Sequence, residues 1–332
     1  MKIRKKLAVV AAAVLVSVFA FTGCGSDRDG SSGSTSSESR DSVTIAMQNG
    51  MSYAPLTIMK EKKLVEKYCD GIEVRWTTLN SGSAVNEGMA SGDIDFGAMG
   101  LSPAITAVAS GLEIKIASSL DSMPNQIMTN DPEIHTLKDV KEDDKIAAVN
   151  IGSFQHILLA MAAEKQLGDA KALDNNIVAM SHPDGTIALT NGTVDLQVTN
   201  PPYLYQEMED TSLHVVEGIS EVWPSGNSTI VFTATEEIHD NYRATYDGVI
   251  KAVQEAIDFI NENPAEAAEI LAEAEGLDAL DYQRWLEEEE TIFSSECRGI
   301  MKVAEFMDKN GFMDREAPKS FSDLAFENVK GD

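Results

Sequence analysis

The sequence contains few of the side chains that bind metals or act as covalent nucleophiles. Among 332 residues there are three cysteines and five histidines. The histidines are scattered, and no pair of them stands at the spacing of metal ligands. We therefore expect no metal site and no cofactor. Cys69 and Cys297 are candidates for a disulfide in an exported protein, but a chain of this length does not need one, so the sequence leaves both states open.

Positive charge is also scarce. Lysine and arginine together number 26 against 54 aspartates and glutamates, which gives a formal net charge of −28. Binding to nucleic acid requires basic side chains that displace counterions from phosphates, so this composition argues against a nucleic-acid partner. The excess of acid is typical of a solubilising surface on an exported protein. An apolar fraction of 43% and the chain length allow two domains, each with its own core.

The beginning of the chain has the pattern of a targeting segment. A basic cluster at residues 2–6 precedes an apolar run at residues 7–21 that is short for a membrane span and typical of a signal peptide. The run ends in "FTGC", which resembles a lipobox, and this predicts lipidation of Cys24. We expect a signal peptide at residues 1–23, a flexible Ser/Gly tether at residues 24–40, and a mature protein held outside the cytoplasmic membrane by its lipid. The alternative is a plain secretory signal with a coincidental cysteine.

One phrase occurs twice, a hundred residues apart. The stretch "SGDIDFGAMGLSP" at residues 91–103 is echoed by "NGTVDLQVTNP" at residues 191–201, and Asp95 aligns with Asp195. The echo extends upstream, where "IAMQNGMSY" is matched by "AAVNIGSF". Each half continues with an apolar strand, a turn and an amphipathic helix. The sequence therefore predicts two βαβαβ units in series.

This repeat predicts an α/β fold in which the two units form either one long sheet or, as we expect, two lobes. Each lobe is expected to be a mostly parallel sheet flanked by helices, with apolar third strands at residues 96–99 and 196–199. Turn signals around residues 112–129 and 223–235 predict a hinge of two strands. The first lobe is then formed by residues 41–122 and 226–332 and the second by residues 123–225. Beyond residue 236 the apolar spacing is helical.

Ligands of open α/β sheets bind beyond the carboxyl ends of the strands, which predicts a site between the lobes. The loops concerned are residues 49–55, 80–83 and 100–103 of the first lobe and 151–156, 181–184 and 200–203 of the second. Glycines and hydroxyl residues at helix starts there predict an oxyanion pocket made of backbone N–H groups. The candidate ligand-binding residues are Asn49, Gly50, Ser52, Tyr53, Ser81, Gly82, Gly100, Leu101, Ser102, Asp121, Gly152, Ser153, Phe154, Gln155, His156, Asn200, Pro201 and Tyr203.

These loops contain no lysine or arginine, no close pair of carboxylates and no cysteine nucleophile. His156 is interpreted as their only side chain that titrates near neutrality, either as a hydrogen-bond donor to the ligand or as a buried helix residue. Asp121 is an acid close to the predicted cleft. Because no nucleophile–base arrangement is present, the sequence indicates a binding protein and not an enzyme.

The order of these segments resembles a known family. The pieces "SGDIDFGAMGLSPAITAVASGLEIKIAS", "LKDVKEDDKIAAVNIGSFQHILLAMAAEKQLG" and "NGTVDLQVTNPPYLYQ" are similar to the solute-binding lipoproteins of ABC importers in the nitrate/sulfonate/taurine class, over roughly residues 41 to 275. The resemblance implies capture of a small solute outside the cell and its delivery to a membrane permease driven by an ATPase. It also implies a two-lobed fold like that of the periplasmic binding proteins of type II topology. Its ligand loops would lie at residues 49–53, 100–102, 152–156 and 200–203. We expect a monomer.

One departure leaves the solute open. Many members have Trp-Glu-Pro-Tyr in the second lobe, where this chain has Thr199-Asn200-Pro201-Pro202-Tyr203. A small organic anion such as a sulfonate is the first expectation, and a neutral pyrimidine precursor of thiamine is the alternative. An enzyme related to thiamine-pyrimidine synthases is a remote alternative. The resemblance to those enzymes would imply a Cys-rich, iron-dependent site, and this sequence has no cluster of cysteines. A sensory domain of the same fold would need a fused signalling domain.

Overall fold

The computed structural model of the protein describes residues 39–332. The predicted signal peptide, the lipidation site at Cys24 and all but the last residues of the tether lie outside the described residues. No helix in the described range is both long and apolar enough to cross a membrane. Within the same range, no three His, Cys, Asp or Glu side chains are grouped so that they could hold a metal ion. Cys69 and Cys297 are both free, so they do not form the disulfide that the sequence left open.

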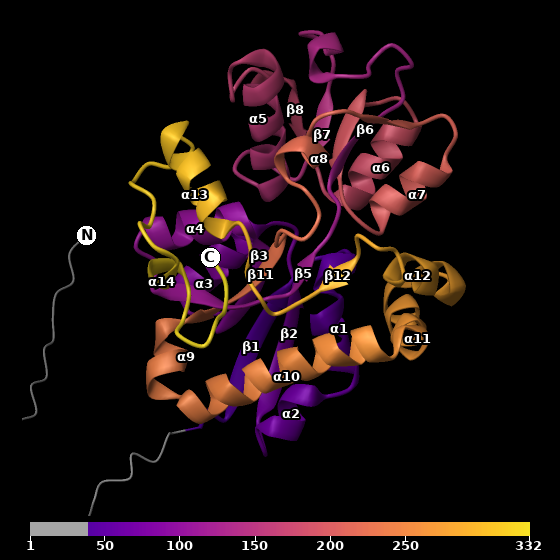
Figure 1. Cartoon of the computed structure of the whole chain (residues 1–332). Helices are drawn as coiled ribbons and strands as arrows, with labels where there is room; N and C mark the ends of the chain where they lie inside the picture. The colour runs from indigo at the N-terminus through magenta and orange to yellow at the C-terminus, as the bar shows by residue number, and fades with distance from the viewer. Residues whose placement is uncertain (1–38) are drawn as a thin grey trace, which may run out of the picture. The chain divides into compact units, whose positions relative to one another are not determined.

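Two five-stranded sheets organise the described chain, one in each lobe (Figure 1). In the first sheet the order is β2 (Glu73–Thr78), β1 (Ser42–Met47), β3 (Phe96–Gly100), β11 (Ile230–Thr235) and β4 (Ile114–Ser119). In the second sheet the order is β8 (Ile177–Ala179), β7 (Ile146–Ala148), β9 (Leu196–Thr199), β6 (Gln126–Thr129) and β10 (His214–Val216).

The two sheets match strand for strand. In each, the first three strands of the βαβαβ unit are parallel, and the fourth neighbour, β11 or β6, runs antiparallel to the third. Every residue of β3 and β9 is buried, as expected for strands covered by helices on both faces. The fold class expected from the repeat is confirmed.

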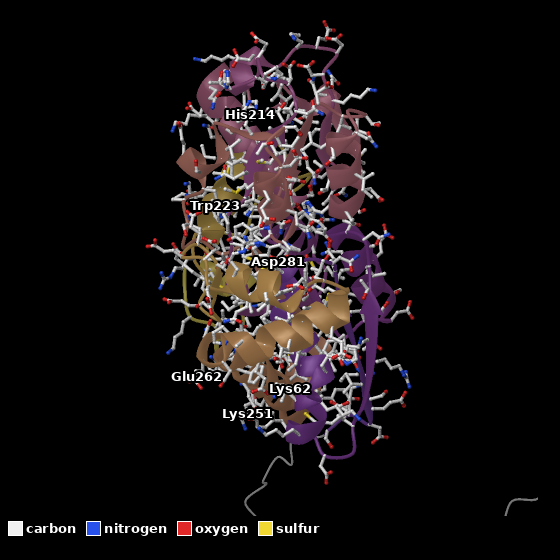
Figure 2. The ribbon with its side chains drawn as sticks, turned by 90° about the vertical axis from the view of Figure 1, so that its right-hand side faces the viewer. Lys62, His214, Trp223, Lys251, Glu262 and Asp281 are labelled. Carbon is white, nitrogen blue, oxygen red and sulfur yellow. The ribbon has the colours of Figure 1, made fainter. Side chains whose placement is uncertain are left out.

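The chain passes from the first sheet to the second after β5 (Asp121–Ser122) and returns through the segment that contains Trp223. Figure 2 shows His214 toward one end of the molecule and Lys62, Lys251 and Glu262 toward the other, with Trp223 between them. The short strand β12 (Ile292–Phe293) pairs with β5 at this crossing. The crossing segments are where a hinge between the lobes would lie.

Helices cover both sheets. Those of the first lobe are α1 (Ala54–Glu61), α2 (Leu64–Tyr68), α3 (Gly82–Ser91), α4 (Leu101–Ala109), α9 (Glu236–Asn241), α10 (Arg243–Glu262), α11 (Pro264–Glu275), α12 (Ala279–Leu286), α13 (Ile300–Lys309) and α14 (Phe321–Leu324). Those of the second are α5 (Phe154–Leu167), α6 (His182–Thr190), α7 (Tyr203–Glu209) and α8 (Ile219–Val222). Short 3₁₀ turns lie at Met51–Tyr53, Leu137–Asp139 and Asp174–Asn176.

The apolar core is continuous between the lobes. One buried cluster includes Met99 of β3, Phe154 of α5 and Val303 of α13, while separate clusters fill the outer faces of each sheet. Phe154 packs edge-on against Trp223, with ring centroids 5.5 Å apart. Helix α13 contacts both α4 and α5, so this late part of the chain joins the two lobes.

Candidate ligand-binding site

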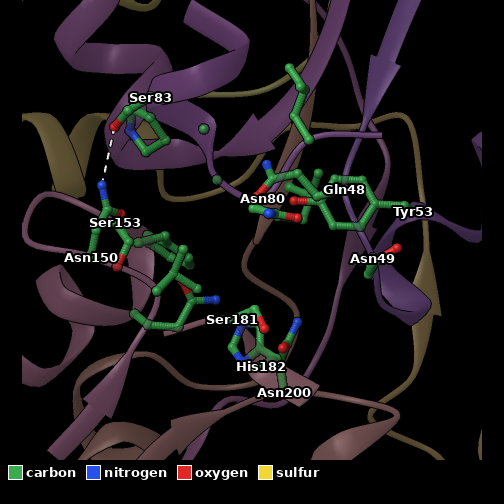
Figure 3. A pocket seen from close by; sticks show the side chains of 18 of the residues that line it. Gln48, Asn49, Tyr53, Asn80, Ser83, Asn150, Ser153, Ser181, His182 and Asn200 are labelled. Carbon is green, nitrogen blue, oxygen red and sulfur yellow. Dashed lines mark hydrogen bonds between the residues drawn. The ribbon is translucent and has the colours of Figure 1, made fainter. Parts of the chain in front are cut away.

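A cavity lies between the lobes at the carboxyl ends of the central strands. About 650 Å³ of space around this cavity is not filled by protein atoms, a volume that includes open solvent at its mouth. The first lobe contributes Gln48, Asn49, Tyr53, Leu79, Asn80, Gly82, Ser83, Gly100, Pro103 and Ile230. The second contributes Val149, Asn150, Ser153, Phe154, Gln155, Ser181, His182, Pro183 and Asn200. Figure 3 shows Gln48, Asn49 and Asn80 on one side of this space and His182 and Asn200 on the other.

The cavity wall carries no charged side chain. Its polar groups are the carboxamides of Gln48, Asn49, Asn80, Asn150, Gln155 and Asn200, together with serine hydroxyls, one phenol and one imidazole. Burial lowers the pKa of His182 to about 4, so the imidazole is neutral at physiological pH. Burial, with a smaller contribution from the charge of Asp121, holds the pKa of Tyr53 above its usual range, so the phenol stays protonated. The wall is therefore polar and neutral.

At this wall, the amino-terminal ends of helices provide the positive electrostatic potential that cationic side chains would otherwise provide. Five helices of eight residues or more, α1, α3 and α4 from one lobe and α5 and α6 from the other, begin at residues that line the cavity or directly after them. Local sequence fixes three of these starts, because Ser81, Ser153 and Ser181 each accept a backbone N–H from the first turn of their helix. The remaining first-turn N–H groups have no partner within their helix and favour negative charge.

Hydrogen bonds between the lobes flank the cavity. The Ser102 hydroxyl donates to the Gly152 carbonyl over 2.9 Å, and the Asn150 carboxamide donates to the Ser83 hydroxyl over 3.2 Å (Figure 3). On another side, the Met51 N–H donates to the Pro201 carbonyl over 3.2 Å. The ring of Tyr203 stacks on His182 with centroids 5.8 Å apart. The structure thus has the lobes in direct contact around the cavity.

The residues predicted from sequence divide into three groups. Those that line the cavity are Asn49, Tyr53, Gly82, Gly100, Ser153, Phe154, Gln155 and Asn200. Gly50 and Tyr203 line an adjoining cavity that shares Gln48 and Asn49 with the first. The others, Ser52, Ser81, Leu101, Ser102, Asp121, Gly152, His156 and Pro201, are absent from both walls.

The third group holds the loops in place. Asp121 is 1% exposed, and its carboxylate accepts from the Thr229 hydroxyl and the Ile230 N–H, so it joins the two crossing segments. His156 is buried in α5, accepts the Gly152 N–H at Nδ1 and shares its Nε2 proton with Asp174. Of the two interpretations of His156, the buried helix residue is therefore the one that the structure shows.

Sequence reasoning missed several lining residues. His182 was overlooked: this imidazole belongs to the loop at residues 181–184 and lines the cavity, whereas His156 does not. Gln48, Leu79, Val149, Asn150 and Ile230 lie outside the loops expected to bind. A signal for two of them is present in the repeat, since Gln48 and Asn150 each precede the matched Gly50 and Gly152 by two residues.

The fold and this cleft define a protein that holds a small solute between two lobes. Solved structures of two binding proteins have the same fold as this chain. The alkanesulfonate-binding protein SsuA from Xanthomonas axonopodis pv. citri, solved bound to MOPS, superposes with a TM-score of 0.71 at 18% identity and covers 89% of this chain and 100% of its own. The nitrate-binding protein NrtA from Synechocystis PCC 6803 gives a TM-score of 0.68 at 16% identity, with 88% and 86% covered.

The sequence itself identifies the family. Residues 36–274 match the NMT1-like family, and the chain belongs to it. A Bacillus subtilis (strain 168) protein named for binding aliphatic sulfonates is 30% identical over 273 residues, which are 80% of this chain and 78% of that protein. These relatives are named as binding proteins, so the expectation that the chain is not an enzyme is confirmed, and the thiamine-pyrimidine synthase alternative is dropped.

Proposed function

We propose that this protein is the extracytoplasmic solute-binding component of an ABC importer. It captures a small organic anion of the sulfonate, taurine or nitrate type in the cleft and delivers it to the permease. The names of its relatives support the ligand class, since they bind aliphatic sulfonates, alkanesulfonates and nitrate. Lipidation at Cys24 anchors it to the membrane, and it works as a monomer; both statements rest on the sequence alone.

The observation that carries this proposal is the convergence of five helix starts on a cavity without charged side chains. A partly buried helix terminus stabilises an anion by up to about 2 kcal/mol, and a charge-assisted N–H bond contributes roughly 1.5–3 kcal/mol. Several such contacts reach the roughly −8 kcal/mol of micromolar binding. A monoanion is favoured over a dianion, because no lysine or arginine offsets a second charge.

A neutral heterocycle such as a pyrimidine precursor of thiamine is the second candidate. One observation favours it: the wall combines carboxamides with the rings of Tyr53, Phe154 and His182. Carboxamides donate and accept hydrogen bonds without requiring charge, and the rings provide surface for stacking. The two candidates differ in whether negative charge on the solute contributes to binding.

A negative charge placed at a helix start distinguishes the anionic solute from the neutral heterocycle. Ser153 caps α5 at the cavity wall, and aspartate caps a helix as well as serine does, so Ser153→Asp keeps the helix while it adds a negative charge to the wall. We expect this variant to weaken binding of ethanesulfonate at least tenfold by calorimetry. A pyrimidine would be affected much less.

Thr235→Asp is the matched control, because Thr235 caps α9 in the same way and does not line the cavity. Its affinity should equal that of the wild type. In the wild type, a bound solute at a hundredfold excess over Kd should stabilise the fold by about 2.7 kcal/mol. If sulfonates, taurine and nitrate all leave the melting temperature unchanged, the anion assignment is wrong, and a shift by the pyrimidine alone would support the second candidate.

A further inference from the structure

Asn200 occupies an unusual position at the cavity wall. It follows β9 directly, is 5% exposed, and lines the cavity opposite Asn49 and Asn80 (Figure 3). Its backbone carbonyl accepts the Leu204 N–H over 3.0 Å, so the main chain at this point is fixed. Its side-chain oxygen Oδ1 is buried and has no hydrogen-bond partner among the described residues.

This orphan acceptor distinguishes Asn200 from the other buried polar groups. Within residues 39–332, nine other buried side-chain atoms have no hydrogen bond of standard geometry, among them Asn86 Oδ1, Asn125 Oδ1 and Gln197 Oε1. None of those nine belongs to a residue of the cavity wall. Two other carboxamides of the wall donate to the protein, Gln48 to the Ala98 carbonyl and Asn150 to the Ser83 hydroxyl, and no other wall carboxamide has a fully buried oxygen without a partner.

A buried acceptor without a partner destabilises the state that contains it, and a solute that supplies a donor removes this cost. The chemistry of the surroundings restricts the donor. No carboxylate lines the cavity, so a cationic group would lose its hydration without gaining a counter-charge. A neutral hydroxyl, amide or ring N–H satisfies Oδ1 at a smaller desolvation cost.

We propose that Asn200 selects, among small organic anions, those that carry a neutral hydrogen-bond donor, such as hydroxyalkanesulfonates, over the unsubstituted alkanesulfonates. This inference rests on the proposed function and narrows its solute class. The acidic group lies at the helix starts, and the donor reaches Oδ1 from the body of the solute. A site built to accept from a donor discriminates strongly against the analogue that lacks it, because its own polar group is then left unpaired.

The test measures Kd by calorimetry for two matched pairs: ethanesulfonate with 2-hydroxyethanesulfonate, and propanesulfonate with 3-hydroxypropanesulfonate. In the wild type, the hydroxylated member of at least one pair should bind about tenfold to a hundredfold more tightly. In Asn200→Leu, which keeps the shape and removes the acceptor, this preference should fall to within about twofold. Asn200→Ala serves the same purpose if the leucine variant does not fold.

Asn125→Leu is the matched control. Asn125 is 4% exposed and also has an unpartnered Oδ1, but it does not line the cavity, so its replacement should leave the preference unchanged. Wild-type binding of both members of each pair with equal affinity overturns this inference and leaves the proposed function intact. Retention of the preference in Asn200→Leu and Asn200→Ala also overturns it. If none of the four sulfonates binds, this inference fails, whereas the proposed function fails only if taurine and nitrate do not bind either.

Discussion

The two lobes share a scaffold and differ in the residues that face the cavity. In the first lobe, the Asp95 carboxylate accepts the Thr44 N–H over 2.8 Å, and the Asp95 N–H donates back to the Thr44 carbonyl. In the second, Asp195 makes the same pair of bonds with Lys145, again with 2.8 Å to the carboxylate. Each aspartate therefore ties the third strand of its unit to the beginning of the first.

The repeated glycines have the same structural role. Gly92 and Gly192 end their helices at φ values of 79° and 73°, and the next two N–H groups of the chain donate to the carbonyl of Gly88 in one lobe and Ala188 in the other. Only glycine adopts this left-handed conformation without cost. The residues in the first part of the repeated phrase therefore stabilise each lobe at the end of its sheet that lies away from the cleft.

The lobes diverge where the phrase reaches the cleft. The third strand of the first lobe ends in Met99 and Gly100, whereas that of the second ends in Thr199 and is followed by Asn200. Beneath the second wall lies a buried polar group centred on Glu207, which accepts the Thr186 hydroxyl over 2.6 Å. Common residues therefore specify the scaffold, and the residues that differ give the cleft its chemistry.

The largest expected effect concerns the buried carboxyl of the second lobe. Burial raises the pKa of Glu207 to about 7 from an ordinary 4.5. The unfolded chain then loses this proton at lower pH than the folded one, so stability falls as pH rises between these values and is level above them. In the wild type, this carboxyl should lower the free energy of unfolding by about 3 kcal/mol as pH rises from 5 to 8. We expect Glu207→Gln to abolish this decrease, which urea unfolding at the two pH values measures.

Glu209→Gln is the control on the same helix, since Glu209 is exposed and should leave the slope unchanged. The first lobe offers the counterpart: burial raises the pKa of Asp121 to about 7. Asp121→Asn should therefore remove a second, separate part of the slope. An unaltered slope in Glu207→Gln would show that this carboxyl titrates normally and that the second wall is hydrated.

A smaller effect tests the shared scaffold. Asp95→Ala and Asp195→Ala should each lower the free energy of unfolding by about 2 kcal/mol, because each leaves backbone N–H groups without a charged acceptor. The loss should be larger for Asp95, which also pairs with Arg40 over 2.8 Å. Urea unfolding measures both, with the exposed Asp93→Ala as control. Equal affinity for the solute in all three is expected, and a selective loss of binding would contradict a purely structural role.

The smallest effect concerns closure of the cleft. Gly100 has φ −61°, a conformation open to any residue, but a Cβ there would lie 2.7 Å from Cβ of Phe154 in the other lobe. Gly100→Ala should hold the lobes apart and weaken solute binding about tenfold, or 1.4 kcal/mol, with little change in stability. Calorimetry measures the affinity. With solute present, small-angle scattering should show a larger radius of gyration for Gly100→Ala than for the wild type.

Gly192→Ala should have the opposite effect, a loss of stability without a loss of affinity for the solute. Its φ of 73° strains any other residue, while no atom lies within 4 Å of the added Cβ. This variant should lose about 1 kcal/mol of stability and keep its affinity. If Gly100→Ala binds as tightly as the wild type, the lobes do not need the contact between Gly100 and Phe154 to enclose the solute.

Sequence reasoning succeeded where periodicity and capping act locally. The third strands at residues 96–99 and 196–199 and helices beyond residue 236, such as α10 and α11, form as their residues predict. It was weaker for single site residues. Ser102 and His156 lie in predicted binding loops, yet one bonds across the cleft and the other faces Asp174, because the direction of a side chain depends on partners distant in sequence.

The sequence alone determined that two similar α/β units follow each other and that their loops carry no cationic side chains, because strand and helix patterns and turn residues are local properties of the chain. Only the tertiary structure decided which loop residues face the cavity, that Asp121 joins the crossing segments, and that Asn200 Oδ1 has no partner within residues 39–332. These features depend on how two separately folded sheets pack against each other, which no local pattern records.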